Sequence, residues 1–394
     1  MSYKTIQLSK AADIIVGFPF ASEKFNINAQ GTRLVRGKNI TTGNLRWGDD
    51  TRWWDDSSID LSKYMLKADD IVIGMDGSLV GKNYAKISEN DLPLLLVQRV
   101  ACIRAKEGYD QRFLWGCIAS GNFERYIDSI KTGTSIPHIS GGQIGNYLIP
   151  DFDLQSQKKI ATILSALDEK IATNREINDN LYAQAKAIFD NHFINIDAIP
   201  AGWRKGNLLG IANYLNGLAM QKFRPQGHEI GLPVLKIKEL RQGLCDDSSE
   251  LCSLSIKPEY IIHNGDVIFS WSGSLLVDIW CGGTCGLNQH LFKVTSDVYD
   301  KWFYYLWTAH HLARFIAIAA DKATTMGHIK REELAKADVL IPCEEDYTSL
   351  SSIMQPVFEL IISNRIESRK LAALRDELLP KLMSGEIDVS AVQL

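Results

Sequence analysis

An internal repeat constrains the fold of this chain more than any other feature of its sequence. Matched positions recur with an offset of 190 residues: Tyr109, Phe113, Thr134 and His138 return as Tyr299, Phe303, Thr324 and His328. The stretches Tyr147–Pro150 and Val339–Pro342 then close the two copies. Ordered matches at one offset indicate that a whole unit was duplicated, so the sequence predicts pseudo-twofold symmetry within one polypeptide.

The match extends through the globular region that precedes each of these stretches. Gly17 corresponds to Gly217, and Asp70–Ile73 corresponds to Asp266–Phe269. Short β-like runs lie between Gly, Asn and Asp turn signals in both regions, and one helix is predicted at residues 111–130. The expected fold class is therefore α+β, with two similar mixed α/β globules.

A heptad pattern follows each globule and predicts two long helices, at residues 154–193 and 347–379. We expect the second helix to end at Pro380, and Pro356 to kink it or to mark a later start. Each helix is expected to pack antiparallel against the other, as in a coiled coil, with Asn in the seam fixing the register. The seam residues are Ile160, Leu164, Leu167, Ile171, Asn174, Leu181, Val357, Ile361, Asn364 and Leu371.

These patterns divide the chain into four segments. The expected boundaries are a globule at 1–153, a helix at 154–195, a second globule at 196–343, and a helix with a C-terminal tail at 344–394. Because each helix directly follows a globule, we interpret the helices as a spacer between two binding domains. Helices that serve only oligomerisation are the alternative.

The charge of the chain gives no support to nucleic-acid binding. The net charge is −4, and the two globules carry +2 (1–150) and +1 (200–341), whereas the helical stretches carry −3 (151–199) and −4 (342–394). Contact with phosphate would therefore depend on local basic patches on the globules.

The composition favours a cytoplasmic protein. The N-terminus has no apolar signal region, and the longest apolar runs fall far short of the roughly 20 residues that a membrane helix needs. Seven Cys in 394 residues do not form a disulfide framework, since their number is small and odd. We expect a reducing compartment.

The two helical stretches resemble one known family. The runs Leu374–Ile387 and Gln157–Ile171, together with Gln184–Phe189, look like the helical motifs of the specificity subunits of type I restriction–modification systems. The order globule, helix, globule, helix resembles that family over essentially the whole chain, although the globules themselves are weakly specific.

This resemblance implies a non-catalytic DNA-recognition subunit. Each globule would be a target recognition domain that reads part of a bipartite site, and the helices would set the unspecified gap. Two modification subunits would bind S-adenosylmethionine and methylate adenine N6, and restriction subunits would use ATP and Mg²⁺. The chain itself would hold no cofactor and no metal.

The sequence supports the non-catalytic interpretation independently of the resemblance. It contains no Asn/Asp-Pro-Pro-Tyr/Phe motif, which an amino-methyltransferase needs, and no Gly-x4-Gly-Lys-Ser/Thr run that would cradle phosphates. The chemistry, if there is any, would come from partners.

Several other motifs are better explained by structural roles than by metal binding or catalysis. Cys281 and Cys285 are half of a zinc pattern without a second pair at fitting spacing, so buried cysteines are expected. The run Trp271–Ser274 lacks the Gly-x-Ser-x-Gly elbow of a hydrolase and is interpreted as a turn. Asp70 and Asp266 match across the copies and are expected to cap turns before buried strands.

His138 and His328 each follow a Thr-containing loop, which suits either contact with DNA or a structural hydrogen bond. Other basic residues are candidates for phosphate or base contact, although any one of them is more often a solvated surface charge. The DNA-binding candidates are Arg33, Arg36, Lys38, Lys82, Lys131, Thr132, Thr134, Lys236, Lys238, Arg241, Lys322, Thr324, Thr325, Lys330 and Arg331. A coiled-coil scaffold whose globules bind other proteins is the alternative function.

Overall fold

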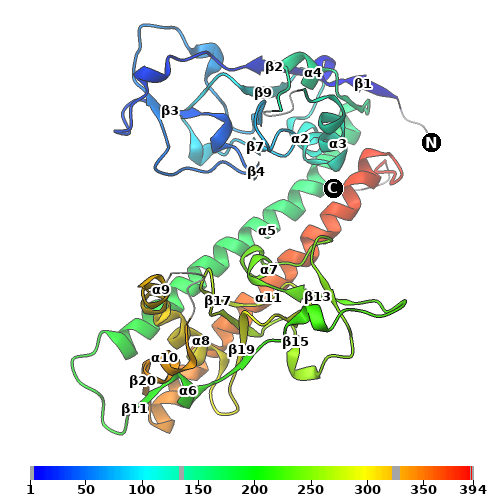
Figure 1. Ribbon diagram of the computed structural model, residues 1–394. Coiled ribbons are helices and arrows are strands. Elements are labelled where there is room, and N and C mark those ends of the chain that lie inside the picture. The colour runs from blue at the N-terminus through cyan, green and yellow to red at the C-terminus, as the bar shows by residue number, and fades with distance from the viewer. Residues whose placement is uncertain (1–3, 133–136, 322–328, 391, 393–394) are drawn as a thin grey trace. The chain divides into compact units, whose positions relative to one another are not determined.

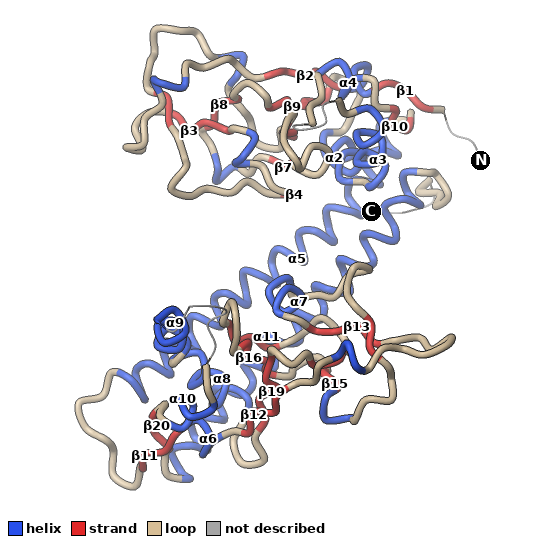
Figure 2. Tube along the Cα trace, viewed as in Figure 1, coloured by secondary structure: helices blue, strands red, loops and turns tan. Residues whose placement is uncertain are grey.

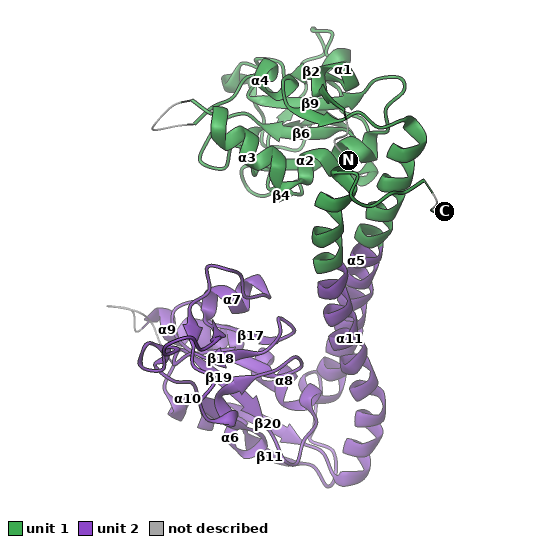
Figure 3. Ribbon diagram, turned by 90° about the vertical axis from the view of Figure 1, so that its right-hand side faces the viewer, with its two compact units in different colours: residues 1–169, 372–394 green, residues 170–371 purple. Residues whose placement is uncertain are grey.

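The computed structural model describes residues 4–132, 137–321, 329–390 and 392. It divides into two compact units, residues 1–169 with 372–394 and residues 170–371 (Figure 3). Each unit holds one globular domain and a segment of each of two long helices. Figures 1 and 2 show the course of the chain and its helices and strands.

The first domain is built on a five-stranded sheet in the order β2-β9-β6-β7-β4 and a three-stranded sheet in the order β5-β3-β8, and β1 pairs with β10. Its strands are β1 (Thr5–Gln7), β2 (Ala12–Val16), β3 (Thr32–Val35), β4 (Thr42–Gly43), β5 (Trp53–Trp54), β6 (Ile71–Gly74), β7 (Tyr84–Lys86), β8 (Leu94–Leu96), β9 (Val100–Ala105) and β10 (Leu148–Pro150). Its helices are α1 (Leu8–Ala11), α2 (Gln111–Ala119), α3 (Gly121–Ile130) and α4 (Gly141–Gly145).

The second domain has a similar arrangement, built on two four-stranded sheets. Its sheets run β12-β19-β16-β17 and β14-β13-β18-β15, and β11 pairs with β20. Its strands are β11 (Arg204–Asn207), β12 (Asn213–Asn216), β13 (Leu232–Leu235), β14 (Leu251–Cys252), β15 (Ile261–Ile262), β16 (Val267–Ser270), β17 (Leu276–Ile279), β18 (Cys285–Leu287), β19 (Leu291–Thr295) and β20 (Asp338–Ile341). Its helices are α6 (Leu208–Ile211), α7 (Ile237–Gln242), α8 (Lys301–His310), α9 (Leu312–Asp321) and α10 (Arg331–Ala335).

The prediction of two similar mixed α/β domains is therefore confirmed. In both domains the central strands are buried on both faces, because the sheet packs against helices on one side and against the second sheet on the other. The apolar runs at β6 and β16 supply these strands, and all four residues of each are buried.

The helix predicted over residues 111–130 is interrupted in the structure. Asp110 caps the first half by accepting hydrogen bonds from the backbone N–H groups of Arg112 and Phe113. Ser120 then adopts an extended conformation, and its hydroxyl donates to the carbonyl of Cys117 at 2.7 Å. A Ser that satisfies a helix-terminal carbonyl, followed by Gly121, ends α2 and starts α3 anew.

The two long helices are α5 (Leu154–Phe189), which continues into a π-helical turn at Asp190–Ile194, and α11 (Glu344–Met383). Of the two alternatives expected for Pro356, a kink or a later start, the later start is wrong, and so is the expected end at Pro380, because α11 runs through both prolines. Apolar packing outweighs the lost backbone hydrogen bonds. Met354 and Phe358 flank Pro356 in the core of the second domain, and Leu382 and Met383 follow Pro380 into the core of the first.

Within each unit the segments of α5 and α11 pack antiparallel. In the first unit Arg375 Nη1 lies 2.7 Å from Asp168 Oδ1. In the second, the Nδ2 of Asn364 donates to Asn178 Oδ1 at 3.0 Å, and Asn174 Nδ2 donates to Glu367 Oε2 at 2.7 Å. The amide pair therefore joins Asn178 to Asn364. The other predicted seam residues are buried or half-buried.

Among the described residues, no helix is both long enough and apolar enough to cross a membrane.

Candidate nucleic-acid interface

Three segments meet at one end of the main sheet in each domain. In the first domain the N–H of Met75 donates to the carbonyl of Arg99, and the N–H of Ile139 donates to the carbonyl of Met75, both at 2.9 Å. These three segments lie at the end of β6, in the β8–β9 turn and before α4. Together we call them the platform. It lies where several turns converge, which is where binding residues are commonly carried.

The second domain has the same platform. The N–H of Trp271 donates to the carbonyl of His290 at 3.4 Å, and the N–H of Ile329 donates to the carbonyl of Trp271 at 3.0 Å. Trp271 therefore stands where Met75 stands, and His290 where Arg99 stands. The backbone of the platform is duplicated even though its side chains differ.

A glycine after the first strand of each main sheet permits this arrangement. A Cβ atom at Gly17 would lie 2.2 Å from the carbonyl oxygen of Val97, and one at Gly217 would lie 2.2 Å from that of Asn288. Any side chain there would displace the turn that carries the platform. The matched glycines of the repeat thus have a steric cause.

The loop after α3 starts and returns at the platform of the first domain. Thr132 and His138 exchange two backbone hydrogen bonds, and Thr132 Oγ1 lies 3.1 Å from His138 Nε2. The His138 side chain is nevertheless exposed. The candidates Thr134, Lys322, Thr324, Thr325 and His328 lie outside the described residues.

Two predicted DNA-binding arginines are tied into the first domain. Arg33 Nη2 donates to the carbonyl of Asp91 at 2.5 Å, and its guanidinium lies 4.6 Å from the centre of the Trp47 ring. Arg36 donates to the carbonyl of Asp50. Burial, and then the positive charge of the neighbouring Arg52, lower the pKa of Arg36. Both side chains therefore connect neighbouring loops of the first domain through backbone carbonyls.

The predicted lysines lie on the surface in ion pairs. Lys38 contacts Asp50 at 3.0 Å, Lys82 contacts Glu124 at 2.9 Å and Lys131 contacts Asp128 at 2.6 Å; in the second domain Lys236 contacts Glu250 at 2.5 Å and Lys238 contacts Asp246 at 3.7 Å. Exposed pairs of this kind are worth little, so a phosphate could replace the carboxylate. Arg241, Lys330 and Arg331 are also exposed.

Comparison with known proteins identifies this architecture. A family model described as the type I restriction modification DNA specificity domain matches residues 19–183. The chain is 27% identical over 331 residues to the type I restriction enzyme MjaIX specificity subunit of Methanocaldococcus jannaschii, covering 78% of this chain and 75% of that protein. It is 22% identical over 458 residues to the EcoBI specificity subunit of Escherichia coli, covering 99% and 91%. Its fold is similar to the crystal structure of a type I restriction–modification S subunit from M. genitalium, with a TM-score of 0.59 at 15% identity, covering 97% and 96%.

The chain is thus similar, in sequence and in fold, to type I restriction–modification specificity subunits.

Five of the seven cysteines are buried, and Cys245 and Cys343 are half-buried. Among the described residues no cluster of three or more His, Cys, Asp or Glu could hold a metal ion. Cys281 and Cys285 are both buried, and burial raises the pKa of the Cys281 thiol. The prediction that these two cysteines are buried is confirmed.

Asp70 and Asp266 cap turns before buried strands, as predicted. Asp70 Oδ2 accepts from the N–H of Lys67, and Asp266 Oδ2 accepts from the N–H of His263, both at 2.8 Å. A cation from the neighbouring strand completes each arrangement. It is Arg104, 2.5 Å from Asp70, in the first domain, and a lysine on β19 in the second.

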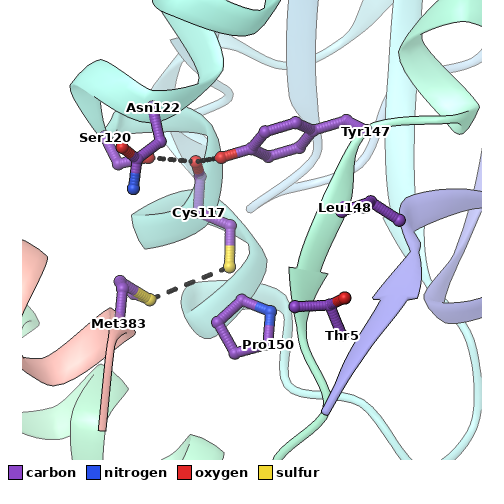
Figure 4. Close-up of a pocket in the computed structure, with 8 residues that line it drawn as sticks. All are labelled: Thr5, Cys117, Ser120, Asn122, Tyr147, Leu148, Pro150 and Met383. Carbon is purple, nitrogen blue, oxygen red and sulfur yellow. Dashed lines mark hydrogen bonds between the residues drawn. The ribbon is translucent and has the colours of Figure 1, made fainter. Parts of the chain in front are cut away.

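A small cavity of about 150 Å³ in the first unit lies where the end of α11 packs on the first domain (Figure 4). Cys117 Sγ lies 3.9 Å from Met383 Sδ, and Ser120 and Tyr147 both donate to the Cys117 carbonyl. Burial raises the pKa of Cys117, so the group is a neutral thiol and not a nucleophile. The cavity belongs to the attachment of α11.

The residues that sequence reasoning missed are the two turn residues of the platform. Gln98-Arg99 and Gln289-His290 stand at equivalent places, and the shared Gln was the available signal. The offset of this pair is 191, and it falls where the offset of the repeat changes from 196 at Gly77 to 190 at Tyr109, between flanking residues that differ.

Proposed function

We propose that this chain is a DNA specificity subunit that recognises a bipartite target, with one half-site read by each globular domain. The observation that carries the proposal is the duplicated platform: two domains of one chain present the same backbone arrangement with different side chains. Phosphate contacts from the surface lysines would supply most of the affinity, and base-edge contacts would supply the specificity.

The long helices would set the distance between the half-sites. Their seam is fixed by polar contacts such as Asn178–Asn364, which specify register at some cost in stability. A fixed register makes the unspecified gap in the target a constant number of base pairs.

The reaction would be carried out by partner subunits. Two modification subunits would bind S-adenosylmethionine and methylate adenine N6 after extruding the base from the duplex. Restriction subunits would use ATP and Mg²⁺. This chain would contribute recognition and positioning only.

A salt series separates this function from that of a protein-binding scaffold. DNA affinity of the complex with its modification subunits should fall linearly on a log–log plot, with a slope of roughly −0.9 per phosphate contacted. The titration should be repeated without the modification subunits. A slope near zero in the complete complex would refute DNA recognition and favour the scaffold.

A further inference from the structure

The turn that joins β8 to β9 and the turn that joins β18 to β19 carry the variable position of the platform. The N–H of Val100 donates to the carbonyl of Val97 at 3.2 Å, and the N–H of Leu291 donates to that of Asn288 at 3.0 Å. Both are therefore hydrogen-bonded four-residue turns with Gln as the second residue. The third residue is Arg99 in one domain and His290 in the other.

Arg99 has a backbone conformation that its side chain disfavours. Its φ is 67°, in the left-handed region, where turns favour Gly or Asn as the third residue. The side chain is exposed and makes no hydrogen bond or ion pair with any described residue. Packing therefore does not explain an arginine here, and strained residues of this kind cluster at ligand contacts.

His290 at the equivalent place is half-buried and held by its neighbours. Its Nδ1 lies 2.9 Å from Ser272 Oγ, and its Nε2 lies 3.3 Å from Gln289 Nε2. His290 is not among the described non-glycine residues with positive φ. The same turn therefore presents a free guanidinium in one domain and a fixed imidazole in the other.

We propose that Arg99 reads a guanine in the half-site of the first domain, with its guanidinium paired to O6 and N7 in the major groove. Arginine makes this bidentate contact because its donors form a planar fork, which lysine lacks. The inference rests on the proposed recognition of DNA by the two domains.

The test compares target motifs of complexes reconstituted with modification subunits on a library of DNA sites. Arg99→Gly removes both the guanidinium and the strain. It should fold with an unchanged or higher Tm, and it should lose about tenfold to a hundredfold in discrimination at one G·C pair of one half-site. Arg99→Lys should keep the salt dependence of the wild type and lose the same discrimination.

Asp69→Gly is the matched control. Asp69 has a φ of 65°, is exposed, and precedes β6 at the end opposite to the platform. The Asp69→Gly variant should have an unchanged or higher Tm, and it should keep the wild-type target motif. His290→Ala should change only the other half-site.

The outcomes separate this inference from the proposed function. A wild-type complex without a bipartite motif would refute the proposed function. A normal wild-type motif that both Arg99 variants retain would refute the role of Arg99 alone. A uniform loss of affinity at all sequences, without loss of discrimination, would also refute it, because it would make Arg99 a phosphate contact.

Discussion

Arg365 of α11 donates two hydrogen bonds to the carboxylate of Asp278 on β17, Nη1 to Oδ1 at 2.8 Å and Nη2 to Oδ2 at 2.6 Å. This bidentate pair fastens the main sheet of the second domain to its helix. The two side chains are 32% and 25% exposed, so solvent screens the pair only in part.

Arg365→Ala should lower the free energy of unfolding of the second unit by about 2–3 kcal/mol, because it removes two hydrogen bonds to a charged acceptor. Urea denaturation measures the change. The matched control is Arg175→Ala, since Arg175 is the repeat equivalent of Arg365 and is exposed. It should change stability by less than about 0.5 kcal/mol.

A double-mutant cycle with Asp278→Ala tests whether the pair itself is responsible. The sum of the two single losses should exceed the loss measured in the double variant by about 1–2 kcal/mol. Strict additivity would show that Arg365 acts through packing alone.

The close approach at Gly17 makes a second prediction. Gly17→Ala should destabilise the first unit by about 1–3 kcal/mol, since its Cβ would stand 2.2 Å from the Val97 carbonyl oxygen. It should also weaken recognition of one half-site by displacing the turn. Gly48→Ala, whose Cβ would meet no atom closer than 3.9 Å, is the control and should be nearly neutral. Equal thermal shifts in the two variants would contradict the steric account.

The start of α5 should show a pH-dependent cap. Asp153 accepts hydrogen bonds from the N–H and the hydroxyl of Ser156 at 3.0 and 2.7 Å, and these bonds lower the pKa of Asp153 below 3.8. Asp153→Ala should therefore cost about 1 kcal/mol at pH 7.

The sign of this effect follows from the lowered pKa. The folded state favours the ionised carboxylate, so the stabilisation is full above the unfolded pKa and is lost as the pH falls through the folded value. The difference between wild type and variant should be constant from pH 7 to about 5 and should shrink below pH 4. A difference that stays constant down to pH 3 would argue against an ionised cap.

How far the sequence predicts this protein depends on the kind of feature. The repeat and the heptads predicted the two domains and the paired helices, because duplication and periodicity are properties of order along the chain. They could not show that α11 would continue past Pro380, since burial of Met383 in the first domain depends on tertiary packing.

The choice of DNA-binding residues stays a prediction. Basic residues were chosen by type, but Arg33 and Arg36 are bound to backbone carbonyls within the first domain, and residue type does not reveal such contacts. The shared Gln could reveal that Gln98-Arg99 and Gln289-His290 are equivalent, but it could not reveal the backbone conformation of Arg99. Only coordinates show that an arginine occupies a position that favours glycine.

The proposed spacer can be lengthened by design. Inserting one heptad in α5 and one in the facing stretch of α11 preserves the seam and adds about 10.5 Å. The unspecified gap of the target should grow by about three base pairs, at 3.4 Å per pair. Inserting a heptad in α5 alone should disrupt the seam and abolish methylation of the bipartite target by the complex. A gap of unchanged length in the doubly extended subunit would remove the spacer role.

The central proposal is tested most directly by mapping methylated adenines in a host that carries the modification subunits, with and without this chain. We expect a motif of two specified halves around a constant gap, which disappears when the chain is absent. Replacing residues 1–153 with another recognition domain should alter one half only. Methylation that does not depend on this chain, or a chimera that alters both halves, would contradict the account.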